Sequence, residues 1–148
     1  MTDQTPAPLG ALALQLLRLF ESELFTAMQQ AGYPDLRLRH SSVLTAIDPA
    51  GTRLTVLAAR AGMTPQSMGE LVDDLESSGY LTRVNDPTDR RARLIIFTDR
   101  GQVAMRACRE IAVAIDRRYA TLVGPHEYDA ARTTLIALRD KLTAEPAE

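Results

Sequence analysis

The sequence predicts a mainly α-helical protein that carries one small β-hairpin. Most of the chain places apolar side chains three and four residues apart, as in the segment 54–61, and these positions share one face of a helix. Two short β-prone runs, 80–84 and 94–97, enclose a stretch rich in turn-forming residues. Aromatic residues make up only 5% of the chain and Trp is absent, so we expect a core of aliphatic side chains.

The first elements in chain order are helices separated by breaks that contain Gly or Pro. We expect a first helix from Leu9 to Ala31, with apolar residues on several sides, which indicates contacts beyond its own domain. The run 32–35 (Gly-Tyr-Pro-Asp) ends this helix, and a second helix is predicted over 38–47. Thr52 is the predicted N-cap of a third, short helix.

A turn and a capped helix follow. Gly62 stands where the residue after a helix often takes a positive φ. Thr64 and Pro65 then restart a helix, with Thr64 as the N-cap and Pro65 in the first turn, where its missing N–H is not needed. This fourth helix is predicted to end near Ser78, and Gly79 stops it.

The hairpin and two further helices complete the chain. Thr98 and Asp99 can cap a long fifth helix that reaches Leu122, and Gly124-Pro125 separates it from a last helix. The apolar residues of the last helix recur at alternating spacings of three and four, the narrow seam of a coiled coil: Tyr128, Ala131, Leu135, Leu138 and Leu142.

The order of helix, Gly-containing turn, capped helix and hairpin is typical of a winged helix-turn-helix. In that motif the second helix enters the DNA major groove and presents its N-terminal residues to base edges. A helical wheel turns Met68 inward, whereas Gln66 faces outward and can bond adenine through its amide. Thr64 and Ser67 are short enough to reach phosphates or base edges. The alternative is a plain helix cap that contacts no partner.

The helix that is predicted to enter the major groove is acidic, and its negative charge opposes the approach of DNA. It carries no Lys or Arg between Thr64 and Gly79, but it carries four acids: Glu70, Asp73, Asp74 and Glu76. At roughly 1.5 Å per residue, the last three can lie clear of the groove. Glu70 can accept a hydrogen bond from cytosine N4, pair with a basic residue of its own chain, or remain solvated.

Arginines gather on and beside the predicted wing. The formal net charge of the chain is -2, but the segment 83–100 holds five Arg against three Asp. Asp86 and Asp89 are expected to pair with some of these arginines, and the alternative is a solvated charged hairpin. Arg83 is a further candidate for DNA binding. Three candidates lie near the tip and descending strand, where Arg can enter a narrow minor groove: Arg90, Arg91 and Arg93.

These segments resemble the multiple-antibiotic-resistance regulator (MarR) family of transcriptional regulators. The resemblance is carried by LTVLAARAGM (54–63), TPQSMGELVDDLESSG (64–79) and the segment 80–101, with its DPTDRR and FTDRG runs. It implies a homodimer whose first and last helices interlock, and a pseudo-palindromic operator with half-sites about 10 base pairs apart. We therefore divide the chain into a helical dimerisation region (1–35 and 99–148) and a winged helix-turn-helix region (36–98).

The resemblance also implies site residues and an effector. Family recognition helices contact DNA early in the helix, which corresponds to Gln66, Ser67 and Met68, although many relatives carry a basic or small polar residue where Glu70 stands. Members commonly bind small aromatic or phenolic ligands between the two regions, which weakens DNA binding and makes a repressor the expected function. His40 is a weak candidate for contacting such a ligand, and a structural role in the core is the favoured interpretation.

Other classes of function find little support in the sequence. The two His and the one Cys are widely separated and offer no metal-ligand spacing, and neither a phosphate-binding Gly-rich loop nor a nucleophile elbow occurs. We expect no enzyme, no cofactor and no metal. Two alternatives stay open: a winged-helix module that binds another protein through the acidic helix, and, with less support, a small helical enzyme.

Cys108 and the chain ends bear on location. A single Cys excludes an intrachain disulfide, and the apolar stripe of the fifth helix favours a buried, inert thiol at Cys108. The N-terminus lacks the pattern of a signal peptide, and no apolar run is long enough to span a membrane. We therefore expect a cytoplasmic protein without membrane contacts.

Overall fold

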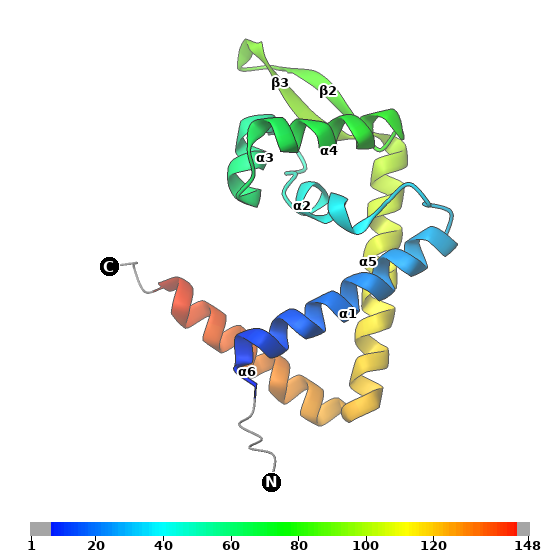
Figure 1. Ribbon diagram of the computed structural model, residues 1–148, viewed down its shortest axis with the longest axis vertical. Helices are drawn as coiled ribbons and strands as arrows, with labels where there is room; N and C mark the ends of the chain where they lie inside the picture. The colour runs from blue at the N-terminus through cyan, green and yellow to red at the C-terminus, as the bar shows by residue number, and fades with distance from the viewer. Residues whose placement is uncertain (1–6, 145–148) are drawn as a thin grey trace. The chain divides into compact units, whose positions relative to one another are not determined.

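The computed structural model describes residues 7–144. The described residues form two compact units, one reaching Ile111 and the other starting at Ala112. Helices dominate both units, and one small antiparallel sheet completes the first (Figure 1). This confirms the predicted fold class. No helix between residues 7 and 144 is long and apolar enough to cross a membrane.

The first helix, α1, runs from Leu9 to Gln30, close to its predicted bounds. The predicted second helix is shorter than expected: a 3-10 helix, η1 (Leu38–His40), leads directly into a four-residue helix, α2 (Ser41–Leu44). The segment tightens at its end, where the N–H of Ala46 bonds to the carbonyl of Val43 only three residues back. Such i to i-3 bonds are typical of a helix terminus, so the helix does not continue to Ile47.

The next segment contains a strand that the sequence did not predict. Strand β1 (Thr52–Arg53) pairs with the hairpin, and α3 (Leu54–Ala61) follows it. Thr52 is therefore not the N-cap of α3, since Arg53 occupies that position. The buried Thr52 hydroxyl instead accepts the N–H of Asp48 at 2.9 Å. The residues around Thr52 suit either a helix N-cap or a strand. Pairing with the distant strand β3 decides in favour of the strand.

The turn into the fourth helix, α4 (Pro65–Ser77), is as predicted. Gly62 ends α3 with φ of 63°, a left-handed conformation that glycine adopts without strain. The Thr64 side chain accepts the N–H of Ser67 at 3.1 Å and so caps α4. The inner face of α4 is buried in the first unit through Met68, Val72 and Leu75.

The sheet has the strand order β1-β3-β2, and all its neighbours are antiparallel. Strands β2 (Leu81–Asp86) and β3 (Asp89–Phe97) are longer than the predicted runs, so only Pro87 and Thr88 connect them. The wing is a tight hairpin that extends past α3 and α4 (Figure 1). Arg90, Arg91 and Arg93 therefore lie within β3 rather than in a loop, and Arg83 lies within β2.

The core of the first unit lies between the sheet, α3, α4 and the η1–α2 segment. Its fully buried side chains include Leu36, Val43, Leu57, Met68, Val72, Leu75, Tyr80, Leu81 and Ile95. Gly101 makes this packing possible, because a Cβ there would lie 2.0 Å from the carbonyl oxygen of Tyr80. The core thus fixes α4 and the wing on one scaffold.

Two long helices complete the chain: α5 (Asp99–Val123) and α6 (Pro125–Ala144). The predicted cap of α5 is present, since Thr98 Oγ1 accepts the N–H of Gly101 at 3.0 Å. Helices α1 and α6 leave large apolar side chains in contact with solvent, and α6 buries none of its residues within the described chain. The exposed ones are Leu9, Leu12, Leu14, Leu16, Leu17, Leu19, Leu135, Ile136, Leu138 and Leu142.

Candidate nucleic-acid interface

The N-terminal turn of α4 presents short polar side chains to solvent. Thr64, Gln66, Ser67 and Glu70 are all exposed. The Thr64 hydroxyl donates to Ser67 Oγ at 3.0 Å while also capping the helix. The Ser67 hydroxyl accepts this bond, so its own hydrogen stays available to a ligand. The turn therefore presents the Gln66 amide and the Ser67 hydroxyl hydrogen to solvent.

Met68 does not belong to this exposed set. Its side chain is 0% exposed and packs in the core with Val72 and Leu75, which follow it on the same helix face. The expectation that Met68 contacts DNA is therefore wrong for its side chain. The helical wheel had already turned this residue inward, and only the family resemblance suggested a contact.

The acids in the second half of α4 are matched by cations of the same chain. Arg83 of β2 bonds to Asp73 at 2.6 Å and also pairs with Glu76, whose other oxygen accepts the backbone N–H of Arg83 at 3.1 Å. These contacts fasten the base of the wing to α4. They also engage the guanidinium of Arg83, a residue that was expected to contact DNA.

Asp74 is matched from the other side of α4. Its Oδ2 lies 2.8 Å from His40 Nε2 and 2.5 Å from Arg39 NH2. The hydrogen bond from His40, with further help from Arg39, holds the pKa of the Asp74 carboxyl below its ordinary value. Asp73, Asp74 and Glu76 thus all have cationic or polar partners within their own unit.

Glu70 is the acid of α4 that has no such partner among the described residues. Its carboxylate makes no hydrogen bond or ion pair within residues 7–144. The alternative that Glu70 pairs with a basic residue of its own chain therefore finds no support. An acceptor remains exposed one turn beyond Gln66.

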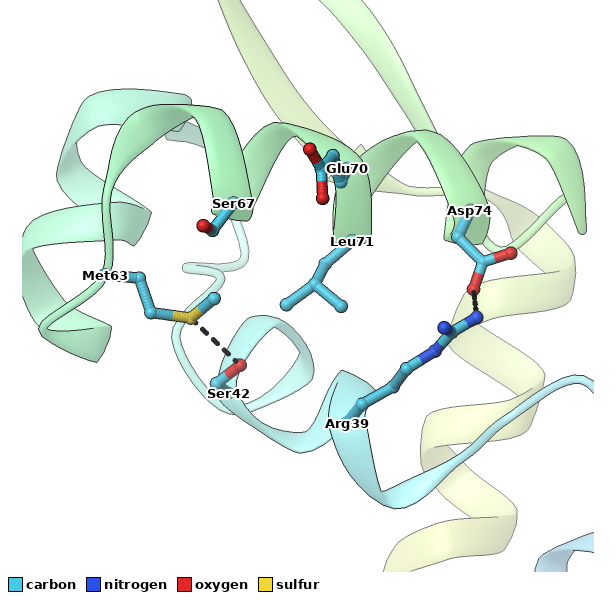
Figure 2. A pocket seen from close by; sticks show the side chains of 7 residues that line it. All are labelled: Arg39, Ser42, Met63, Ser67, Glu70, Leu71 and Asp74. Carbon is cyan, nitrogen blue, oxygen red and sulfur yellow. Dashed lines mark hydrogen bonds and ion pairs between the residues drawn. The ribbon is translucent and has the colours of Figure 1, made fainter.

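A cleft of about 560 Å³ opens beside α4 (Figure 2). Leu71 points into it from α4, and the Ser42 hydroxyl on the facing wall donates to Met63 Sδ at 3.8 Å. The lining residues are Arg39, Ser42, Met63, Ser67, Glu70, Leu71 and Asp74. The cleft lies along the edge of the exposed polar turn, so Ser67 and Glu70 border open space.

The wing is held by a buried carboxylate. Asp86 is 6% exposed and accepts two hydrogen bonds from Arg53, from Nε at 2.8 Å and NH2 at 2.6 Å. Its other oxygen accepts the N–H and the hydroxyl of Thr88, at 2.8 and 2.7 Å. These bonds, the Thr88 bonds most strongly, lower the pKa of Asp86 from 3.8 to about 2.

This arrangement corrects the expected pairing of the wing. Asp86 was expected to bind the wing arginines, but Arg53 of β1 is its partner. Asp89 accepts the backbone N–H of Arg91 at 3.0 Å and lies 3.7 Å from Arg53. The guanidinium groups on β3 make no ion pair within the described residues and are exposed: Arg90, Arg91 and Arg93.

The burial and contacts of His40 and Cys108 suit structural roles. His40 is 1% exposed and both ring nitrogens are bonded, so it has no free group for an effector and the favoured structural interpretation is supported. Burial raises the pKa of the Cys108 thiol, which is half-buried on α5. No group of three His, Cys, Asp or Glu within residues 7–144 could hold a metal ion.

Comparison with known proteins places this site in a family. The family model described as "MarR family" matches residues 35–92, the segment that contains α3, α4 and most of the wing. Transcriptional regulator HosA of Escherichia coli O111:H- is 30% identical over 106 residues, which cover 71% of this chain and 77% of HosA. The chain belongs to the MarR family. It is therefore a transcriptional regulator with a winged-helix DNA-binding fold.

Solved structures agree with membership of the MarR family. CouR from Rhodococcus jostii RHA1, bound to p-coumaroyl-CoA, is 28% identical, with a TM-score of 0.67 over 89% of this chain and 92% of CouR. A structure described as the transcriptional repressor CouR bound to a 23-mer DNA duplex is 20% identical, with a TM-score of 0.71 over 94% of this chain and 97% of that chain. The second likeness shows the shared MarR fold.

Sequence reasoning missed Arg39 and Arg53, the two arginines that complete the site. Arg39 lies 35 residues from Asp74, and Arg53 lies 33 residues from Asp86. No spacing rule connects positions so far apart. The available signal for Arg39 was the excess of acids on α4, which favours cationic partners from elsewhere in the chain.

Proposed function

We propose that this MarR-family regulator binds a pseudo-palindromic operator as a homodimer, with α4 in the major groove and the wing against the neighbouring backbone and minor groove. The distribution of free charge supports this most strongly. Three acids of α4 are matched inside the protein, whereas the three wing arginines are exposed without partners. Positive charge is therefore available where the motif meets DNA.

The N-terminal turn of α4 supplies base recognition in this proposal. Gln66 presents an amide that can bond the N6 and N7 atoms of adenine, and the free acceptor of Glu70 suits the amino group of cytosine. Thr64 and Ser67 lie at the helix N-terminus, where backbone N–H groups also favour phosphate. Such contacts discriminate between sequences more than they increase total affinity.

The wing supplies attraction. Arg90, Arg91 and Arg93 are exposed on β3, and each phosphate that they neutralise releases condensed counterions. Arg83 contributes indirectly, because its ion pairs with Asp73 and Glu76 hold β2 of the wing against α4. We therefore reassign Arg83 from direct contact to support. This internal matching also leaves less of an acidic face on α4 for a protein partner.

The exposed apolar side chains of α1 and α6 support a homodimer. Leu16 of α1 is 52% exposed and Leu142 of α6 is 62% exposed, and helices that expose several large apolar side chains often mark association sites. Two identical subunits related by a twofold axis present two copies of α4. Their operator would accordingly repeat after about one helical turn, or 10 base pairs.

CouR supports the proposed regulation. Its descriptions name it a transcriptional repressor and show it bound to p-coumaroyl-CoA, which carries a phenol. We extend both properties to this chain: it represses transcription in the cytoplasm, and a small aromatic or phenolic ligand releases it from DNA. The likeness to CouR thus favours a repressor over an activator.

Selection of binding sites from a random pool of duplex DNA tests the proposal. The full-length protein should enrich a two-part site, and affinity for that site should fall steeply as salt rises. Repeating the selection with p-coumaroyl-CoA and simpler phenols tests release by ligand. A pool that shows no enrichment after repeated rounds would contradict sequence-specific binding.

A further inference from the structure

His40 is a buried histidine that bonds directly to the proposed recognition helix. Its Nδ1 accepts the backbone N–H of Arg37 at 3.1 Å, and its Nε2 lies 2.8 Å from Asp74 Oδ2. A nitrogen that accepts an amide proton carries none itself, so the ring proton sits on Nε2 and is donated to Asp74. Both nitrogens are committed, and the ring is 1% exposed.

Two side chains from the η1 segment hold the same carboxylate oxygen, in different surroundings. Arg39 reaches Asp74 Oδ2 from outside, and its side chain is 56% exposed. His40 reaches the same atom from inside the core. A part-buried hydrogen bond from a buried donor to a charged group contributes more than an ion pair with an exposed side chain, which water and salt screen. The His40 contact is therefore the stronger of the two constraints on α4.

The position of Asp74 on α4 connects this constraint to base recognition. Glu70 and Ser67 precede Asp74 by four and seven residues, so the three side chains lie on one side of the helix. They line the same cleft beside η1 and α2 (Figure 2). A fixed point at Asp74 thus limits rotation of α4 about its axis. Binding groups need to be held to about 0.5 Å and 10–20°.

We infer that His40 is a positioning residue for base recognition, because its hydrogen bond to Asp74 fixes the rotation of α4 and so aims Ser67 and Glu70. The inference rests on the proposed binding of α4 in the major groove. It assigns His40 a role in specificity rather than in attraction, since the attraction comes from the wing arginines.

Two amide substitutions separate this role from the contribution of His40 to folding. His40→Gln keeps a donor near the position of Nε2, within reach of Asp74, but offers no acceptor to Arg37. His40→Asn does the opposite: it keeps an acceptor near Nδ1 and is too short for Asp74. Both variants leave the formal charge unchanged. Fluorescence anisotropy would measure the Kd of each full-length protein for the selected operator and for a scrambled duplex of equal length and composition.

We expect His40→Asn to bind the operator about tenfold more weakly than the wild type, a loss of about 1.4 kcal/mol, while His40→Gln stays within about twofold. Both should bind the scrambled duplex like the wild type, because non-specific affinity depends on phosphate contacts. Asp48→Asn is the matched control. It neutralises a carboxylate held by Arg60 and Thr52, away from α4, and should leave the ratio of the two Kd values unchanged.

Equal operator affinities for wild type and His40→Asn would overturn the inference, as would a parallel loss on both duplexes. Should His40→Asn fail to fold, Asp74→Asn and Asp74→Leu replace it, since both remove the charge but only Asn keeps an acceptor for His40. If Asp74→Leu binds the operator more weakly than Asp74→Asn, the inference is supported. If the two variants bind the operator equally, the inference is overturned. A wild-type protein that prefers no operator contradicts the proposed function instead.

Discussion

The guanidinium of Arg53 donates two hydrogen bonds to one oxygen of the Asp86 carboxylate, from Nε at 2.8 Å and from NH2 at 2.6 Å. This contact joins the short strand β1 to the turn of the wing, 33 residues further along the chain. It leaves the arginines of β3 unpaired and exposed. Arg53, which lies outside the hairpin, therefore stabilises the turn of the wing. The unpaired positive charge of the wing comes from the arginines of β3.

The Asp86 contact predicts a specific acid dependence of stability. Its pKa is lowered from 3.8 in the unfolded reference to about 2 in the folded protein. A lowered pKa stabilises the fold above the unfolded value and loses that effect as pH falls through the folded value. The wild type should therefore exceed Asp86→Asn in Tm above about pH 4 and lose this advantage by about pH 2. A difference that is constant across this range would contradict the prediction.

Gln66 should determine a base preference rather than overall affinity. Gln66→Ala removes the amide that can bond adenine, so we expect a loss of about 1–3 kcal/mol on the selected operator. Binding to operators altered at the contacted base pair should change little, which appears as a relaxed preference in a repeated selection. An unchanged preference at every position would exclude Gln66 from the major groove.

Arg91 and Arg83 should respond differently to salt. Arg91→Ala is expected to weaken binding to all sequences and to lower the slope of log K against log salt by about 1, because one phosphate contact is lost. Arg83→Ala should leave this slope unchanged, since the Arg83 guanidinium is bonded to Asp73 and Glu76. Titrations at several salt concentrations make the comparison. A lowered slope for Arg83→Ala would restore it to the DNA contacts.

In a dimer, the apolar faces of α1 and α6 of one subunit should pack against those of the other subunit and become buried. Light scattering at micromolar protein is expected to give twice the mass of one chain. Leu16→Glu places a charge on the exposed face of α1 and should shift the protein towards monomers, because an unpaired charge in an apolar interface is strongly unfavourable. Gln29→Glu adds the same charge to a polar position on α1 and serves as the control. A wild-type protein with the mass of one chain would rule out the dimer.

Short-range features of the fold were predictable from the residues alone. The left-handed Gly62, the cap at Thr64 and the cap at Thr98 depend on atoms only a few positions apart in the chain. The inward face of α4 follows from helical spacing, which turned Met68 into the core. These features are local because a helix end must satisfy its own N–H and carbonyl groups.

The sequence by itself thus determined the order of the helices, the winged motif and the residues at the exposed start of α4. Tertiary structure decided which charges remain free. The pairs Arg53–Asp86 and His40–Asp74 join residues 33 and 34 positions apart, and β1 exists because a distant strand accepts its hydrogen bonds. Electrostatic and hydrogen-bond partners are selected by proximity in the folded chain, so no local pattern specifies them.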